Sequence, residues 1–418
     1  MKHGMMFRRL KGATAATVAV ACASVPAATA VDATERGVPA QPGAPPKPGG
    51  VALTWAPTHM SDNHEYSRRR AIRIARNHDL VSAPPVSFAD HVRAMRRVNP
   101  DITLIAYQNG TLVQASKVRG LPESAFAHDS RGRRITTPIW GTTLMAPTSR
   151  AWRRFVTAEC RDRVQRAGYD GCLVDSTGLG IYSPSQRFTG IPVNPRTGSR
   201  YTQRQYRSAQ AGLADAIRAA SPRLVHVFNN VSNDYRYWRD PVRSRPLALG
   251  RPAVQMEDFL RGATSEVALP DKEKWLRSVR VVRDLEAHNV AGVFTTKLWV
   301  AHTTAQAARW QAYAMASFLL GANGNSYFAF TRSRDRAGAT GRNAPYSMPN
   351  RIGRPEGRMV KMGSGAYKRT FTRGMALVNP RATTVRVRLP SAMRDLSGAR
   401  VTSVRLGPRT GEVLKKVR

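Results

Sequence analysis

Two acidic side chains end short apolar segments, where the burial of a charge is costly and needs a reason. Asp175 closes the segment YDGCLVD, and Glu257 lies in AVQMEDF. Counting by twos puts Gln255 and Glu257 on one face of the second segment and turns Asp258 away from it. A register shifted by one residue would instead make Asp258 the inward residue. For Asp175, an ion pair with one of the many arginines is the alternative to a catalytic role.

A pair of opposed carboxyl groups is what glycoside hydrolysis requires. One carboxylate attacks the sugar or activates water, and the other carboxyl group, kept protonated by its surroundings, protonates the leaving oxygen. Asp175 and Glu257 are therefore the predicted catalytic residues. Their separation would decide between retention, at about 5–5.5 Å, and inversion, at about 6.5–9.5 Å.

Aromatic and polar side chains near the ends of the apolar segments suit a saccharide. Aromatic rings stack on the apolar faces of sugars, and amide or ammonium groups hydrogen-bond their hydroxyls. The aromatic residues have ordinary core packing as the alternative. The predicted substrate-binding residues are Trp55, Tyr107, Trp140, Asn229, Asn230, Lys297 and Trp299. Further polar residues near strand ends, with loop capping as the alternative, are His59, Asp62, Gln108, Asn109 and Asp335.

The motifs of other chemistries are missing from the sequence. It contains no HExxH, no GxSxG, no Walker loop and no cluster of histidine and cysteine. The glycine-rich piece GANGNSY follows a predicted helix, and we interpret it as a turn and not as a phosphate cradle. The sequence therefore predicts neither a metal site nor a cofactor.

The elements that must position these residues follow from an alternation of apolar segments and helical-period segments. This alternation indicates βαβ units with a parallel sheet, and eight units over about 280 residues suit a (β/α)₈ barrel. An open doubly wound sheet is the alternative, although no GxGxxG follows the first strand. The predicted strands are 51–57, 78–84, 102–108, 171–176, 224–230, 253–259, 291–299 and 326–331. The predicted helices are 65–77, 87–98, 149–167, 200–220, 271–289 and 303–320, and no clear helix is predicted in 231–252.

The barrel determines where the two carboxyl groups lie. Active sites of such barrels are formed at the carboxyl ends of the strands. Asp175 ends the fourth strand and Glu257 ends the sixth, two positions further round. We therefore expect the two side chains to face each other across the mouth.

The pattern changes after residue 331. Residues 332–358 are rich in Gly, Arg and Pro and are expected to form a loop. Beyond them, apolar and polar residues alternate between turn residues, which is typical of antiparallel strands. The sequence predicts a barrel domain over 51–350 and, over 360–418, a small antiparallel β-sandwich packed on the barrel.

The N-terminus has the features of a signal peptide over residues 1–30. A basic start precedes a short run of small apolar residues, and cleavage is expected near Ala30 and Val31. A lipid anchor on Cys22 is the alternative. Residues 31–50 are rich in Pro and Gly and read as a flexible linker. We expect a secreted or cell-surface protein with no transmembrane segment after cleavage, since no other segment is long and apolar enough.

Two cysteines remain after cleavage, Cys160 and Cys172. In an exported protein they suggest one disulfide. Two buried thiols, one on a helix and one on the strand after it, are the alternative.

The charge balance is strongly basic, with 66 Lys+Arg against 27 Asp+Glu and a formal net charge of +39. Such a field attracts polyanions, but arginine codons rich in G and C would give the same composition without a function. Basic and aromatic residues do not gather on one segment, so no specific nucleic-acid binding is predicted. We expect a monomer whose partner is a neutral or anionic poly- or oligosaccharide.

Several segments together resemble the hypothetical glycosyl hydrolase family 15 of bacterial exported proteins. They are YDGCLVDS, LVHVFNN, AVQMEDF, AYAMASFLLGANGNSYF and the C-terminal AYKRTFTRGMALVNP with the segments VRLP and DLSGARVTSVRLGPRTGEVL. The barrel part is also similar to endo-α-1,4-polygalactosaminidases and, more remotely, to α-galactosidases. The resemblance spans residues 51–418 and implies a retaining hydrolase with Asp175 as nucleophile and Glu257 as acid/base. Ser176 stands where relatives often carry a second acidic residue, which argues against a helper carboxylate there.

Three functions remain to be distinguished. The first is a glycosidase, the second a carbohydrate-binding protein without activity, and the third a polyanion-binding protein. A binding protein has no need of opposed carboxyl groups, so the pair favours the first.

Overall fold

The structure is a computed structural model of the 418-residue chain. It describes residues 43–45, 53–61, 65–178, 180–181, 187–239, 244–263, 265–333 and 352–417. The predicted signal peptide, most of the predicted linker, Asp62 and Asp335 lie outside the described residues.

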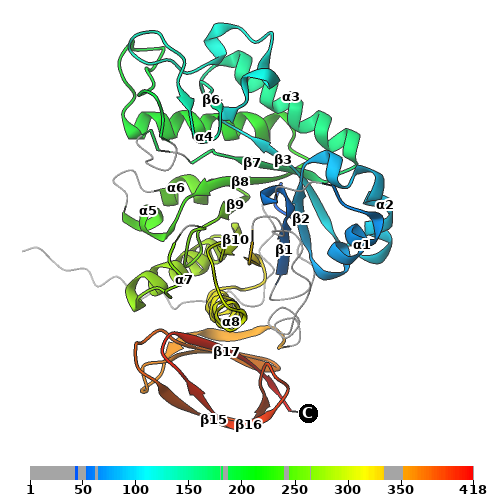
Figure 1. The fold of residues 1–418 in the computed structure, drawn as a ribbon, viewed down its shortest axis with the longest axis vertical. Helices are drawn as coiled ribbons and strands as arrows, with labels where there is room; N and C mark the ends of the chain where they lie inside the picture. The colour runs from blue at the N-terminus through cyan, green and yellow to red at the C-terminus, as the bar shows by residue number, and fades with distance from the viewer. Residues whose placement is uncertain are drawn as a thin grey trace, which may run out of the picture. The chain divides into compact units, whose positions relative to one another are not determined.

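Eight parallel strands close into a barrel in the order β1-β11-β10-β9-β8-β7-β3-β2 (Figure 1). The strands are β1 (Leu53–Pro57), β2 (Leu80–Ala83), β3 (Thr103–Asn109), β7 (Gly171–Asp175), β8 (Val225–Val231), β9 (Ala253–Met256), β10 (Ala291–Lys297) and β11 (Tyr327–Thr331). All eight predicted strands are confirmed. They could be predicted because their apolar segments are short and are separated by segments with a helical period. β1 pairs with both β2 and β11, so the alternative of an open sheet is wrong.

The predicted helices are present, and all but the second begin after a residue whose side chain caps the helix. They are α1 (Arg68–Asn77), α2 (Val92–Val98), α3 (Arg150–Ala167), α4 (Gln203–Ala220), α7 (Lys272–Ala287) and α8 (Thr304–Leu319). Thr202 and Thr303 form capping boxes with the glutamines three residues later. Segment 231–252, predicted to have no clear helix, holds the short helices α5 (Asp234–Arg239) and α6 (Ser244–Leu249). Pro246 is tolerated there because it lies in the first turn of α6.

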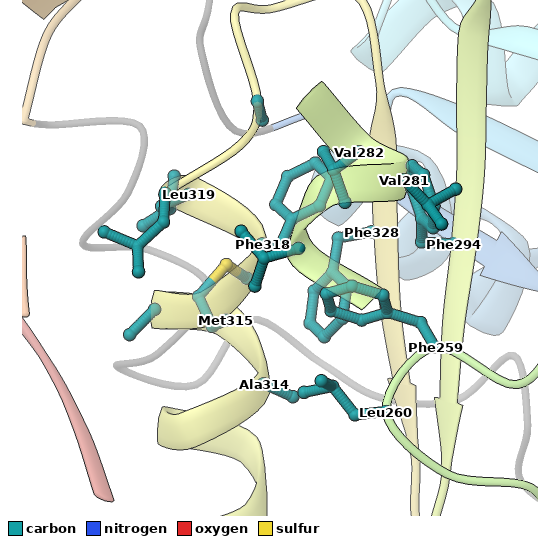
Figure 2. Packing of buried hydrophobic residues seen from close by; sticks show 14 of the residues in the cluster. Phe259, Leu260, Val281, Val282, Phe294, Ala314, Met315, Phe318, Leu319 and Phe328 are labelled. Atoms are coloured by element: carbon teal, nitrogen blue, oxygen red, sulfur yellow. The ribbon is translucent and has the colours of Figure 1, made fainter. Parts of the chain in front are cut away.

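The inward and outward faces of the strands follow the alternation of the sequence. Phe294 of β10 and Phe328 of β11 point outward to Phe318 of α8, at centroid distances of 6.0 and 5.3 Å (Figure 2). Val293 belongs instead to the cluster that fills the barrel interior. Because side chains alternate, Lys297 at the end of β10 shares the inward face with Val293.

A small sheet that the sequence did not predict follows β3. It consists of β4 (Leu112–Val113), β5 (Thr136–Thr137) and β6 (Thr142–Leu144), and its core includes Ile181 and Tyr201 from the segment after β7. The segment after β3 and the segment after β7 both leave the carboxyl ends of barrel strands, which is the side of the barrel on which active sites form. The short 3₁₀ helices are η1 (Thr58–Met60), η2 (Pro85–Ser87), η3 (Ala89–His91), η4 (Ala115–Val118) and η5 (Glu123–Ala125).

The C-terminal part is an antiparallel sheet, as predicted, in the order β12-β13-β14-β17-β15-β16. Its strands are β12 (Pro355–Lys361), β13 (Tyr367–Phe371), β14 (Gly374–Asn379), β15 (Val385–Arg394), β16 (Arg400–Leu406) and β17 (Thr410–Lys416). The sheet encloses an apolar core, with Leu377 and Leu414 packed with Val387 of β15. β12 starts at Pro355, inside the segment that was expected to be a loop. The sequence did not predict this start because the residues of β12 are mostly exposed and show no apolar alternation.

The predicted packing of this sheet on the barrel is confirmed at α8. β17 crosses the helix so closely that a Cβ on Gly411 would lie 2.8 Å from the Cβ of Ala316. The Arg369 guanidinium donates to the carbonyls of Leu319, the last residue of that helix, and of Ala322, at 3.2 and 2.7 Å. These contacts explain why glycine and a buried arginine stand at the two positions.

Candidate active site

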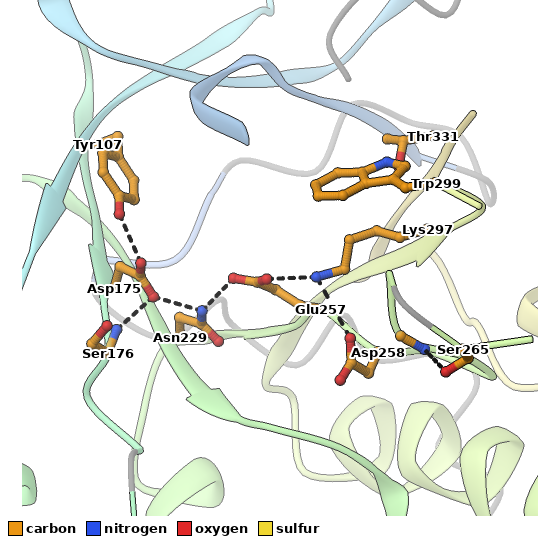
Figure 3. Close-up of polar contacts among 11 residues, drawn as sticks. Tyr107, Asp175, Ser176, Asn229, Glu257, Asp258, Ser265, Lys297, Trp299 and Thr331 are labelled. Atoms are coloured by element: carbon orange, nitrogen blue, oxygen red, sulfur yellow. Dashed lines mark hydrogen bonds and ion pairs between the residues drawn. The ribbon is translucent and has the colours of Figure 1, made fainter. Parts of the chain in front are cut away.

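Asp175 lies at the carboxyl end of β7 and accepts three hydrogen bonds (Figure 3). The Tyr107 hydroxyl donates to Oδ2 at 2.7 Å, and the Asn229 amide donates to Oδ1 at 2.7 Å. The backbone N–H of Ser176 donates to Oδ1 at 2.6 Å. Ser176 has a φ of 61°, a left-handed conformation that is uncommon for a residue with a side chain. The backbone after the strand is therefore held in a strained turn beside the carboxylate.

Glu257 follows directly after β9 and has two partners. The Asn229 amide donates to its Oε1 at 2.5 Å, and the Lys297 ammonium donates to its Oε2 at 2.8 Å. Lys297 also lies 3.5 Å from Asp258 Oδ1, and its Nζ stands 5.4 Å from the centre of the Trp299 ring. The Trp299 indole is fixed by a 2.8 Å hydrogen bond to Thr331 at the end of β11.

One amide nitrogen thus connects the two predicted catalytic residues. Asn229 Nδ2 donates one proton to Asp175 and the other to Glu257. The two accepting oxygens can be no further apart than the sum of 2.7 and 2.5 Å. This bound is below the separation of about 6.5–9.5 Å that leaves room for a water molecule in inverting glycosidases.

The electrostatics of the pair differ between its members. Burial raises the pKa of Asp175, and the charge of Glu257 raises it further. Burial also acts to raise the pKa of Glu257, but the charge and hydrogen bond of Lys297 outweigh it and lower the pKa below its usual value. Burial thus favours the neutral form of Asp175, whereas Lys297 favours the ionised form of Glu257. These preferences are opposite to those that a nucleophilic Asp175 and an acidic Glu257 need at the start of a reaction.

The neighbouring groups respond to the same charges. Burial acts to lower the pKa of Lys297, but Glu257 and Asp258 together raise it, so the ammonium stays charged. Burial raises the pKa of Asp258 even though Lys297 opposes this. Burial, with the charge of Asp175, raises the pKa of Tyr107 well above its usual value, so its hydroxyl remains a donor.

The structure brings Tyr107, Asn229 and Lys297 to the carboxyl pair, with Trp299 beside Lys297. Whether they bind a sugar stays a prediction. His59, one of the further polar residues predicted near strand ends, lies at the same mouth. Its ring stacks on Tyr107 with centroids 4.8 Å apart, and its Nδ1 hydrogen-bonds Ser82 Oγ at 2.6 Å.

Three predicted substrate-binding residues lie elsewhere. Trp55 is only 1% exposed in the barrel core, where its indole donates to the Phe294 carbonyl at 2.8 Å, so it presents no face to a ligand. Asn230 is buried at the register shift that follows Asn229 in β8. Trp140 is 50% exposed in the turn between β5 and β6 and not at the end of a barrel strand. These placements do not support direct roles for Trp55 and Asn230.

The polar residues after β3 have structural partners. Gln108 points outward and donates to the Val156 carbonyl at 3.2 Å. The Asn109 side chain accepts from the backbone N–H groups of Thr111 and Leu112, at 3.1 and 2.6 Å. Asn109 therefore caps the loop after β3, which was the alternative to a ligand contact.

Asp258 is not turned away from the mouth, contrary to the alternation argument. It approaches Lys297 because β9 ends at Met256, and strict alternation does not hold beyond the end of a strand. The inward position of Glu257 agrees with the prediction.

A disulfide joins Cys160 of α3 to Cys172 of β7, whose Cα atoms are 6.1 Å apart. The predicted bridge is present, and the alternative of two thiols is wrong. Cys172 stands three residues before Asp175 on the same strand, so the bridge ties that strand to the helix covering it.

Within the described ranges, no group of His, Cys, Asp and Glu residues could hold a metal ion. Among the same residues, no helix has both the length and the apolar character to cross a bilayer.

A closed parallel barrel with paired carboxyl groups at the carboxyl ends of its strands is the architecture of the barrel glycoside hydrolases. The chain belongs to the hypothetical glycosyl hydrolase family 15, which matches residues 96–375. The resemblance seen in the sequence is thereby confirmed, and the family assignment makes the chain a glycosidase by class. No curated protein matches the chain.

Solved structures with the same fold are glycosidases of distant sequence. The pullulanase from Anoxybacillus sp. LM18-11 in complex with maltotriose is 10% identical, with a TM-score of 0.53 over 89% of this chain and 71% of the pullulanase. A maltogenic α-amylase from Thermotoga neapolitana is also 10% identical, with a TM-score of 0.51 over 88% of this chain and 99% of the amylase. At such identities the similarity establishes the barrel fold and not the substrate.

Proposed function

We propose that this protein is an exported glycosidase that cleaves O-glycosidic bonds of a poly- or oligosaccharide with retention. Asp175 would attack the anomeric carbon, and Glu257 would protonate the leaving oxygen and then deprotonate the incoming water. The observation that carries the proposal is the single Asn229 amide that hydrogen-bonds both carboxyl groups. Their short separation supports retention.

The hydrogen bonds on Asp175 support its role as the nucleophile. Tyr107, Asn229 and the Ser176 N–H fix the carboxylate and leave its orientation defined before substrate arrives. Such preorganisation is a main way in which an enzyme lowers the activation barrier of a displacement reaction. Trp299 and Tyr107 offer aromatic surfaces for the sugar ring.

The proposed substrate is an acidic saccharide. The net charge of +39 supports this class, since a basic protein concentrates anionic polymers at its surface. We propose that the protein acts as a monomer.

The proposed location is outside the cytoplasm. The Cys160–Cys172 disulfide supports export because such bridges persist in oxidising compartments. The basic and apolar features of residues 1–30 support a signal peptide, with a linker over 31–50, the barrel over 51–350 and the β domain over 360–418.

Asp175→Asn and Glu257→Gln should each reduce hydrolysis by at least about 10³-fold while sparing the fold, because each removes one of two cooperating groups. The measurement is release of reducing ends from a glycan panel that includes galactosaminoglycans and acidic wall polymers. Asp101→Asn, which removes an exposed carboxylate, is the control. Full activity in either variant would refute that assignment, and binding without cleavage by the wild type would favour the carbohydrate-binding alternative.

A further inference from the structure

The Lys297 ammonium lies between two consecutive carboxylates. Its Nζ is 2.8 Å from Glu257 Oε2 and 3.5 Å from Asp258 Oδ1. The Lys297 side chain is 9% exposed, whereas those of Glu257 and Asp258 are 28% and 39% exposed. The cation is therefore enclosed, while both of its partners can exchange protons with solvent.

The two contacts of the ammonium differ in length, and the carboxylates that make them belong to neighbouring residues. An ammonium is a compact charge on a flexible stem with three rotatable donors, so a small movement of Nζ changes which carboxylate it contacts more closely. The Trp299 ring, 5.4 Å away and held by Thr331, covers one side of the ammonium and limits that movement.

The proposed chemistry requires such a movement. A general acid must hold a proton when the glycosidic bond breaks. Lys297 stabilises the ionised form of Glu257, because its ammonium donates to Oε2 at 2.8 Å. Asp258 is a second carboxylate within reach, so the ammonium can leave Glu257 without becoming a buried unpaired charge.

We propose that Lys297 is a positioning residue shared between Glu257 and Asp258, and that its transfer toward Asp258 allows Glu257 to take up the proton that it donates. This inference rests on the proposed acid/base role of Glu257. Solvent supplies the proton, which binds to Glu257 and passes to the leaving oxygen of the substrate.

Other groups also act on this trio. His59 and Asn229 lower the pKa of Glu257, each from a different side of the mouth. Asp175 faces Glu257 through Asn229 and couples to it by charge. On the far side, Lys274 acts on Asp258 and Asp258 acts on Arg261, so that Lys297 is one of several cations near this carboxylate.

The decisive measurement is a titration without substrate. Carbon-13 NMR of protein labelled at the glutamate carboxyl carbon reports the Glu257 pKa directly, and the Glu257→Gln variant assigns its resonance. Lys297→Met should raise this pKa by one unit or more because the partner cation is lost. Asp258→Asn should lower it, since the ammonium then has only Glu257 to pair with. Lys272→Met, at the exposed start of α7, is the control for loss of one positive charge and should change nothing.

Loss of the Asp258 charge lowers the Glu257 pKa by itself, because the two carboxylates repel each other. The signature of a shared cation is therefore that Asp258→Asn lowers the Glu257 pKa more with Lys297 present than in the Lys297→Met background. Equal shifts in the two backgrounds, or no shift in either, would overturn the inference. If Lys297→Met fails to fold, Lys297→Gln supplies the background without the cation.

With a substrate in hand, the basic limb of the pH–rate profile gives a second readout. The limb should move to higher pH in Lys297→Met and to lower pH in Asp258→Asn, and Lys297→Arg should return it toward the wild-type position. A purely structural role would reduce the rate at every pH without moving the limb. If no glycan is cleaved, the proposed function fails, and the NMR titration still tests the shared cation.

Discussion

At the scale of single residues, Asn229 is the part of the site on which the rest depends. It is neutral, and it donates to both carboxyl groups at once, so it separates two groups that would otherwise repel each other. Asn229 pairs regularly with Gln255 of β9 and shares the inward face of β8 with Val225 and Val227, and the register shift follows it. The sequence predicted that Asn229 ends a strand but not that it bridges the pair, because the bridge depends on distances between strands that the residue pattern does not give.

Asn229→Asp changes one atom and turns the donor into a third carboxylate. We expect the new group to take up a proton with a raised pKa in the folded protein. The unfolded chain ionises first as the pH rises, so the free energy of unfolding should fall with rising pH relative to wild type. The measurement is denaturant unfolding at several pH values, with Asn99→Asp as the control, since Asn99 donates to two carbonyls instead of carboxylates. An equal loss at every pH would contradict the bridging role.

At the scale of elements, the strands and long helices could be predicted and the insertions could not. Each barrel strand is a short apolar segment before a helix with a capping residue, and those signals are local. The small sheet after β3 has strands of two or three residues, too short to show a period. The alternation argument wrongly turned Asp258 away from the mouth for a related reason, because β9 ends two residues before it.

Glu412 in β17 provides a test of the C-terminal sheet. Burial raises its pKa to about 7, against about 4.3 in an unfolded chain. Between these values the unfolded chain loses a proton that the folded chain keeps, so stability falls as the pH rises and the full penalty remains above about 7.

Glu412→Gln keeps an acceptor for the Leu396 N–H and removes the penalty. At pH 8 it should raise the free energy of unfolding by up to about 3 kcal/mol, and at pH 4 by nothing, as measured by denaturant unfolding. Glu356→Gln, at an exposed position of β12, is the control. Equal effects of Glu412→Gln at both pH values would show that Glu412 is not held protonated.

At the scale of the whole molecule, the remaining question is whether the positive charge has a function. On β15 and β16, Arg386 stands directly opposite Arg405, and Arg394 opposite Arg400. Like charges in directly opposed positions destabilise a sheet. No ion pair joins any of these four arginines to a carboxylate of the described residues, so they provide a place to test whether the charge has a function.

Arg386→Ser combined with Arg405→Ser should lower the salt concentration that elutes the protein from an immobilised acidic polysaccharide. Arg93→Ser combined with Arg97→Ser removes the same charge from the exposed side of α2 and is the control. A larger shift for the sheet pair would support a binding face. Equal shifts would mean that only the total charge matters, as expected if the arginines reflect codon composition.

The contact between α8 and the C-terminal sheet has a consequence for how this chain can evolve. The core around α8 includes Tyr313 of the helix together with Tyr367 and Val413 of the sheet, so one apolar layer serves both parts. A chain that ended after β11 would expose the apolar face of α8 to water. An exchange of either part for an unrelated one would therefore require new side chains on this face of α8.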